Sequence, residues 1–336
     1  MIKPQIKNMN TNVPISDLPL VTDYPPILEA AQRGDLLLFI GAGVSRIIGC
    51  PSWAELAKKY LDFVFDGELV NYSEYKHLAK QDSRKLLSIC QELIIKDPKK
   101  ISFDIQKALE DHAKSSPNKY SDIYQHLDNF NCPYVTTNFE DFLDSDLILP
   151  ETKTGGDVSK VSVPAKTVYY HFSDLQDPAL LKPHDVVHIH GSVHDPKKRE
   201  LVLTIREYFN AYNRNTVGGT TDLPEFLNKL FKDKVVLFVG YGLEEYEVLE
   251  FIVNNIDDPT LMRHYMLSPF MEEESNVIPL QKTYYTQLGV NLVPYSISKI
   301  GYPQLYYVIK DWSKTVGKNS KPKKFLDDLS TIDSIL

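Results

Sequence analysis

The stretch LLLFIGAGVSRIIGCPSWAEL, residues 36–56, passes from an apolar run through a glycine-containing turn into an amphipathic segment. The five apolar residues 36–40 are typical of a strand buried on both faces, as in a parallel sheet covered by helices. Gly41 and Gly43 follow at the carboxyl end of this strand, where glycine lets a ligand approach the main chain closely. A phosphate suits such a turn, because several amide N–H groups can converge on it.

Two common phosphate-binding loops are excluded by the residues of this turn. The dinucleotide pattern G-x-G-x-x-G requires a third glycine where the chain has Arg46. No G-x-x-x-x-G-K-[ST] pattern occurs anywhere in the sequence. Taken alone, the G-A-G turn is therefore equally compatible with a phosphate site and with a tight structural turn.

The charge balance argues against a large nucleic-acid interface. The 336 residues include 37 Lys and Arg against 45 Asp and Glu, which gives a net charge of −8, and 43% of the residues are hydrophobic. Nucleic-acid binding relies on cationic groups that neutralise phosphates. We therefore expect a globular protein with a proper core and no direct nucleic-acid binding.

The cysteines and the apolar runs bear on the expected compartment. Cys50, Cys90 and Cys132 are widely separated and form no C-x-x-C pair, which favours a reducing compartment over a zinc ribbon or a disulfide framework. No apolar run approaches the roughly 20 residues of a membrane span. The sequence therefore predicts a cytoplasmic protein without a membrane partner.

Strand and helix patterns alternate and predict an α/β fold with a doubly wound, mostly parallel sheet. Helical spacing dominates residues 52–130, which we expect to be a helical module inserted between two strands. The sheet pattern resumes at 132–139 and recurs at 167–172, 185–191, 200–204, 234–242, 264–268 and 290–295. We expect one catalytic domain over 24–312, with an N-terminal arm at 1–23 and a linker and docking segment at 313–336.

Polar residues follow three later strands at their carboxyl ends. The stretches are YVTTNFEDFLD at 134–144, VVHIHGSV at 186–193 and VVLFVGYGLEEYEVL at 235–249. The first passes through Thr137 and Asn138 into a predicted helix, and the second ends its strand at His190 and Gly191. Because ligands bind outside the carboxyl ends of parallel strands, we expect these residues to converge on one crevice.

The motif order GAGVS, TTNFEDFLD, a strand ending in HG, and FVGYGLEEYEV resembles the sirtuin (Sir2-type) fold, specifically the sirtuin-like NADase domains of bacterial antiphage defence systems. The resemblance extends over about residues 25–310. It implies a Rossmann-like fold, NAD as the substrate and no metal. It also implies Asn138 facing the nicotinamide ribose to position the attacking water, with His190 as the base.

The resemblance further implies an NAD-binding set of residues. The set consists of Gly41, Ala42, Gly43 and Ser45 at the pyrophosphate, Gly240 and Tyr241 on the adenosine side, Asn291 near the adenine, and Thr137, Glu140 and Gly191. One departure concerns the family pattern T-T-N-Y-D, because Phe139 and Glu140 replace its Tyr-Asp pair. The longer carboxylate keeps the charge but moves it.

The chemistry of these residue types fits the implied reaction. Breaking the nicotinamide–ribose bond creates an oxocarbenium-like centre, which requires a positioned nucleophile and a proton acceptor near neutral pH. Histidine has a suitable unperturbed pKa, and asparagine orients water without titrating.

Other interpretations of the same residues remain open. His188 lies two residues before His190, on the same face of the predicted strand, and an H-x-H pair can ligate a metal, as in metallohydrolases. Asn138 could instead cap the helix predicted after it. Trp53 lies among aromatic residues at helical spacing and is interpreted as a core residue.

The leading functional hypothesis is an NAD glycohydrolase that yields nicotinamide and ADP-ribose and depletes NAD during abortive infection. The alternatives are an NAD-dependent protein deacylase and a non-catalytic sensor of NAD or ADP-ribose. Deacylation by sirtuins usually accompanies a four-cysteine zinc module, which three scattered cysteines cannot build.

Control of such an enzyme implies an oligomer or a partner. An always-active NADase would kill its own cell, so we expect a homo-oligomer or a defence-system partner protein such as an ATPase. The end of the chain carries apolar residues at near-helical spacing, namely Phe325, Leu326, Leu329, Ile332 and Ile335. Such a stripe could be buried against another chain or against its own domain.

Overall fold

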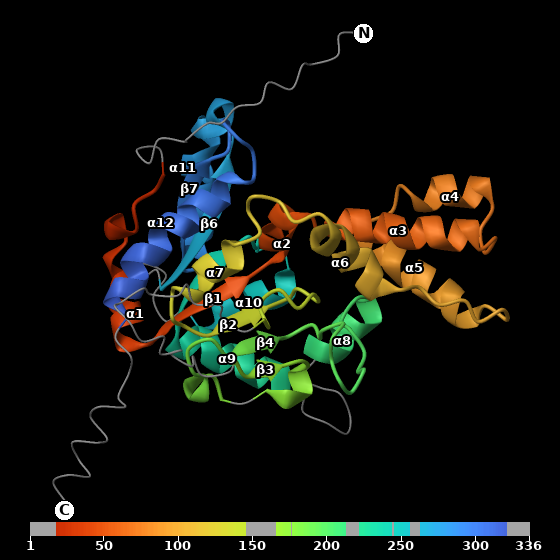
Figure 1. The fold of residues 1–336 in the computed structure, drawn as a ribbon, viewed down its shortest axis with the longest axis horizontal. Coiled ribbons are helices and arrows are strands. Elements are labelled where there is room, and N and C mark those ends of the chain that lie inside the picture. The colour runs from red at the N-terminus through yellow and green to blue at the C-terminus, as the bar shows by residue number, and fades with distance from the viewer. Residues whose placement is uncertain are drawn as a thin grey trace, which may run out of the picture.

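The computed structural model describes residues 18–145, 166–175, 177–212, 222–243, 245–255 and 263–320. Its sheet has seven strands in the order β3-β4-β2-β1-β5-β6-β7, and each neighbouring pair is parallel (Figure 1). The strands are β1 (Leu36–Ile40), β2 (Tyr134–Thr136), β3 (Val168–Tyr169), β4 (Val186–His188), β5 (Val235–Val239), β6 (His264–Phe270) and β7 (Val290–Ser296). The predicted doubly wound α/β fold of the Rossmann-like type is confirmed.

Helices cover both faces of this sheet. Among the described residues they are α1 (Pro25–Arg33), α2 (Ala42–Ile48), α3 (Trp53–Asp66), α4 (Tyr72–Leu78), α5 (Ser83–Lys96), α6 (Ile105–Ser115), α7 (Ile123–Asp128), α8 (Ile205–Tyr212), α9 (Asp222–Asp233), α10 (Tyr246–Asn254), α11 (Ile278–Gln287) and α12 (Gln304–Asn319). Short 3-10 helices are η2 (Val21–Asp23), η3 (Phe172–Asp174), η4 (Pro178–Leu180) and η5 (Glu272–Val277).

The apolar run of β1 is explained by two cores, one on each face. Leu36, Leu38 and Ile40 pack in the first core, with residues of α1, α2, α7 and α12. Leu37 and Phe39 pack in the second, with residues of α8, α9 and α10. Because side chains alternate across a strand, only a continuous apolar run can serve both cores.

The helical module consists of α3 to α6 and has a core of its own. It extends away from the sheet beside α8 (Figure 1). Helix α3 begins at a capping box in which the Ser52 hydroxyl accepts from the Glu55 N–H and the Glu55 carboxylate accepts from the Ser52 N–H. The module core continues into Phe139 and Leu203 of the sheet domain. Helix α7, inside the predicted 52–130 range, packs in the first sheet core instead.

Two predicted elements are not formed. Residues 139–145 form turns instead of the predicted helix, and 200–204 contain no strand. The Phe139 carbonyl accepts hydrogen bonds from the N–H of Val193 and the hydroxyl of Ser192, so it is used by the loop after β4 rather than by a helix. In the second segment, Val202 is buried and donates its N–H to the His190 carbonyl at 2.8 Å.

The packed unit extends past the expected domain boundaries at 23 and 312. Leu18 is buried, and the indole of Trp312 donates to the Pro19 carbonyl at 2.6 Å. Helix α12 continues to Asn319, with Val316 fully buried. The arm at 1–17 and the apolar residues of the predicted docking segment lie outside the described residues. None of the helices described here is both long and apolar enough to cross a membrane.

Candidate active site

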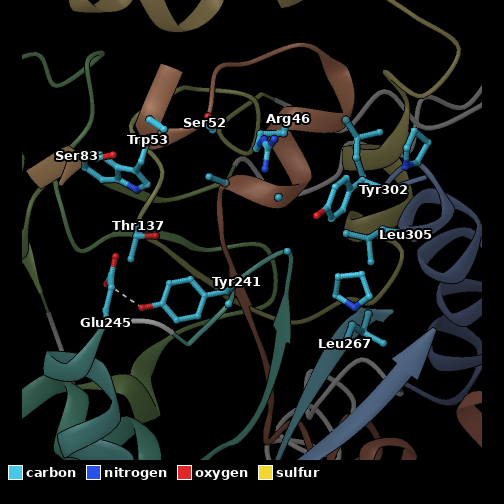
Figure 2. Close-up of a pocket in the computed structure, with 18 of the residues that line it drawn as sticks. Arg46, Ser52, Trp53, Ser83, Thr137, Tyr241, Glu245, Leu267, Tyr302 and Leu305 are labelled. Carbon is cyan, nitrogen blue, oxygen red and sulfur yellow. Dashed lines mark hydrogen bonds between the residues drawn. The ribbon is translucent and has the colours of Figure 1, made fainter. Parts of the chain in front are cut away.

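A cavity of about 980 Å³ opens at the carboxyl ends of the central strands (Figure 2). Strand β1 pairs with β2, the next strand along the chain, at one edge and with β5 at its other edge. Ligands of doubly wound sheets bind at such a switch point. The volume lies at the upper end of the roughly 300–1,000 Å³ usual for small-molecule and cofactor sites. The predicted crevice therefore exists and has the size of a cofactor site.

Two groups of side chains lie across this cavity from each other. Figure 2 shows a carboxylate end formed by Trp53, Ser83, Thr137 and Glu245, and an arginine end formed by Arg46, Leu267, Tyr302 and Leu305. The wall between them includes Ala42 and Gly43 of the G-A-G turn and Gly240 after β5.

The G-A-G turn is held against the end of β5 by close backbone packing. Gly43 donates its N–H to the Gly240 carbonyl at 2.8 Å, and Gly41 donates to the Val239 carbonyl at 3.0 Å. A Cβ on Gly43 would lie 2.7 Å from the Gly240 carbonyl oxygen, and a Cβ on Gly240 would lie 2.6 Å from the Val44 nitrogen. Gly240 also has a φ of +63°, which favours glycine. The glycines thus have a structural role, while Gly43 also lines the cavity.

The structure brings most predicted site residues together and leaves a few elsewhere. The large cavity is lined by Ala42, Gly43, Thr137, Gly240 and Tyr241, and an adjoining cavity of about 30 Å³ is lined by Ser45, Asn138 and Glu140 together with Ala42 and Thr137. The predicted residues that line neither cavity are Gly41, His190, Gly191 and Asn291.

Asn138 is buried and has a free donor. Its backbone N–H donates to the Thr136 hydroxyl at 3.0 Å. Its side-chain Nδ2 makes no hydrogen bond of ordinary geometry to a described protein atom, although the Asn138 side chain lies close enough to Glu140 to oppose the rise in the pKa of that carboxyl group. Because 139–145 form turns, Asn138 caps no helix. The amide is therefore available to a small ligand in the adjoining cavity, which has room for about one water.

Glu140 lies in the same small cavity as Asn138 and Ser45. Its side chain is buried, and this burial raises the pKa of the carboxyl group. Glu140 thus places a carboxyl group in the small cavity that Asn138 also lines.

His188 lies between two hydrogen-bond acceptors. Its Nδ1 is 2.8 Å from the Asn138 carbonyl oxygen, and its Nε2 is 2.9 Å from Oδ1 of Asp144. Burial opposes the charged form, but these two partners raise the pKa of His188 above its usual value. An imidazolium that donates from both nitrogens satisfies both acceptors.

The expectation that His188 and His190 share one face is wrong. Strand β4 ends at His188, and residues 189–190 form a turn, so the alternation of a strand does not reach His190. The His190 Nε2 lies 2.7 Å from the hydroxyl of Tyr212, which is on α8. The partners of His188, by contrast, are Asn138 and Asp144. The two histidines have separate hydrogen-bond partners and do not form a metal-ligand pair.

His190 is fully buried behind the cavity wall. Burial, together with the charge of Arg84, lowers the pKa of His190 to about 3. The cavity-lining residue next to it is Glu245, whose Oε2 lies 3.9 Å from the His190 Nε2.

Glu245 is a functional candidate that the motif analysis did not single out. It precedes α10 and caps no N–H of that helix with its side chain. Instead, its Oε2 accepts from the Tyr241 hydroxyl at 2.8 Å, and its Oε1 accepts from the Tyr208 hydroxyl at 3.4 Å. Burial is the main cause that raises the pKa of Glu245 to about 7. The sequence signal that could have identified Glu245 is its position just after the strand and glycines of FVGYG, residues 238–242.

The helical module contributes one wall of the cavity. Arg84, at the start of α5, lies 3.2 Å from the Glu247 carboxylate and 4.1 Å from the Tyr208 ring centroid. Trp53 packs against the module core, as expected, with its ring edge-on to Phe139, and it also lines the cavity.

The arginine end of the cavity combines one cation with aromatic and apolar surface. Arg46 lies 5.7 Å from the Tyr302 ring centroid and has no carboxylate within ion-pair distance among the residues described. Tyr295, near the carboxyl end of β7, also lines this cavity. Asn291 lies four residues earlier, about 13 Å along the strand. Tyr295, rather than Asn291, is therefore the residue of β7 that lines this end of the cavity.

One cluster outside the cavity has metal-ligand residue types. Ligand atoms of Glu110, Asp141 and His194 lie within 4.8 Å of one another. The Lys114 ammonium lies 2.8 Å from Glu110 Oε2 and 3.0 Å from Asp141 Oδ1. A metal ion would have to compete with this cation.

Residues 133–288 match the family model of the SIR2-like domain. The matched region begins just before β2 and includes Asn138, His190 and Glu245, whereas the G-A-G turn precedes it. A search of curated proteins found no match. The match supports a Sir2-type domain and, because SIR2-like proteins use NAD, an NAD-related activity.

Proposed function

We propose that this protein is an NAD glycohydrolase that releases nicotinamide and ADP-ribose. The single observation that carries the proposal is the buried, unpartnered Nδ2 of Asn138 beside a cofactor-sized cavity at the switch point of the sheet. A buried donor without a partner is costly, so its position is best explained by a ligand that it binds.

The charges of the cavity fit a dinucleotide. The Arg46 guanidinium can pair with a pyrophosphate, a geometry that suits arginine. Tyr302 and Tyr295 offer aromatic surface for a base at the same end. At the other end, the Glu245 carboxylate complements a positively charged nicotinamide ring.

Water is the proposed acceptor of the ribosyl group. The Asn138 amide would orient a water where the adjoining cavity meets the large one at Thr137, which lines both. Cys50 and Cys132 belong to the first sheet core and Cys90 to the core of the helical module, and three cysteines cannot build a four-cysteine zinc module, so the residues present favour hydrolysis over deacylation.

The biological role that we propose is NAD depletion in antiphage defence, in the cytoplasm. Such an activity requires control, and a partner or a second copy of the chain can supply it only by binding the active state more tightly. We propose that this control comes from a homo-oligomer or from a defence-system partner such as an ATPase.

The test compares nicotinamide release from NAD by the parental chain and by Asn138→Ala, measured by chromatography. We expect a loss of at least ~100-fold in the variant with an unchanged circular dichroism spectrum. Equal turnover by both proteins would reject the assignment. A further arm adds EDTA, because a metallohydrolase would lose activity and regain it with zinc, whereas the proposed reaction would be unaffected.

A further inference from the structure

The proposed reaction needs a proton acceptor that faces the substrate, and His190 does not line the cavity. Glu245 does line it, together with Thr137, and Thr137 also lines the adjoining cavity that contains Asn138. Glu245 is therefore the cavity-lining carboxylate that lies against the buried His190, with its Oε2 3.9 Å from the His190 Nε2.

Resting on the proposed function, we propose that Glu245 accepts the proton of the attacking water and that His190 positions Glu245. In this step the bond between the anomeric carbon and the nicotinamide nitrogen breaks, and its electron pair passes to the ring nitrogen, which becomes neutral. A water oxygen bonds to the anomeric carbon, and the water proton passes to a carboxylate oxygen of Glu245. The products are nicotinamide and ADP-ribose.

Two hydroxyl groups hold this carboxylate in place. Tyr241 donates to Oε2 at 2.8 Å, and Tyr208 donates to Oε1 at 3.4 Å. The His190 Nδ1 lies 3.5 Å from the Tyr208 hydroxyl, and its ring packs edge-on against the Tyr208 ring. His190 thus orients a tyrosine that orients Glu245, which makes it a positioning residue.

The charged and titratable groups around Glu245 come from five parts of the fold. They are Arg84 on α5, Tyr208 and Tyr212 on α8, His190 after β4, Tyr241 after β5 and Glu247 on α10. Burial raises the pKa of Glu245, Glu247 adds to this, and Tyr241, Arg84 and Tyr208 oppose it, with a result of about 7. A carboxyl group with this pKa is suited to proton transfer near neutral pH.

The test measures nicotinamide release by the full chain from pH 5 to pH 9. The variants are Glu245→Gln, Glu245→Asp and His190→Gln, with Glu250→Gln as the matched control. Glu250 lies on α10, which Glu245 precedes, and it is exposed and does not line the cavity. Calorimetric binding of ADP-ribose and circular dichroism report on the fold of each variant independently of turnover.

We expect parental turnover to rise about tenfold per pH unit below pH 7 and to level off above it. Glu245→Gln should lose at least ~100-fold in turnover and keep ADP-ribose binding, Glu245→Asp should regain part of the activity, and Glu250→Gln should stay near the parental rate. His190→Gln should turn over NAD about tenfold more slowly than the parental chain, and its turnover should still fall below pH 7.

Two results would overturn parts of the account separately. If Glu245→Gln keeps the parental rate and acidic limb while His190→Gln abolishes turnover, His190 is the base. The role of Glu245 is then rejected, while the proposed function stands. If the parental chain binds ADP-ribose but releases no nicotinamide, in vitro or on expression in cells, the proposed function is rejected. The role of Glu245 as proton acceptor is then rejected as well.

Discussion

The Nδ1 of His188 lies 2.8 Å from the carbonyl oxygen of Asn138. The other ring nitrogen contacts Asp144, six residues further along the same turn segment. Both ends of the segment 138–144 are therefore tied to the end of β4. This arrangement fixes Asn138 without a helix and explains why the segment departs from its helical pattern.

His188→Gln should lower stability in a pH-dependent way. Because Asp144 and the Asn138 carbonyl raise the pKa of His188 in the folded state, their stabilisation is fully present below the unfolded value of about 6.5 and is lost as pH rises through the raised pKa. We expect a loss in free energy of unfolding on the order of 2 kcal/mol at pH 5.5 and a smaller loss at pH 9. Urea unfolding at both pH values measures this, and an equal loss at both would contradict the charged-imidazole account.

Gly240→Ala should be strongly destabilising, because its Cβ would meet the Val44 nitrogen at 2.6 Å in a left-handed backbone. We expect a cost above ~2 kcal/mol. Gly301→Ala is the matched control, since Gly301 also has a positive φ but the nearest atom, in Pro303, is 3.8 Å away. That control should cost about 1 kcal/mol. Similar melting temperatures for the two variants would disprove the close-packing argument.

Arg46→Ala should weaken NAD binding more than it slows chemistry. The guanidinium lies at the arginine end of the cavity, without a carboxylate partner among the described residues. We expect KM to rise about tenfold with kcat nearly unchanged, as for a contact made equally in the ground and transition states. Arg33→Ala is the control, because Arg33 pairs with Asp35 away from the cavity. A fall in kcat at constant KM would speak against a phosphate contact.

Self-association should depend on the end of the chain. Since α12 continues to Asn319 and buries Val316, the informative truncation ends at residue 320 rather than at 312. We expect light scattering to give an oligomer for the full chain and a smaller species for the truncated chain. Monomers in both cases, with equal NAD turnover and no response to added partner proteins, would exclude this form of control.

The fold could be predicted because the apolar patterns of the sequence reflect the burial of side chains. The run 36–40 predicted a two-sided buried strand, and that strand lies at the centre of the sheet. The segment 200–204 has an apolar run of only three residues and packs beside His190 without a strand partner, because composition reflects burial and not strand pairing.

The site was predicted less completely, because the motifs define positions along the chain and not the directions of side chains. Thr137 and Asn138 lie at the cavities as expected. His190 turns away because its strand ends two residues earlier, which no spacing rule indicates. Glu245 depends on Tyr208, which α8 brings from 37 residues away. The site predictions themselves await the kinetic tests.

Hydrolysis of NAD without an acyl acceptor can be measured by following NAD, nicotinamide and ADP-ribose together over time in a mixture of the full chain and NAD without any acylated peptide. We expect nicotinamide and ADP-ribose to appear in equal amounts as NAD disappears, and Asn138→Ala to stop all three changes. Nicotinamide release that requires an acyl-lysine peptide, or tight NAD binding without cleavage on purified protein and in cells, would contradict this expectation.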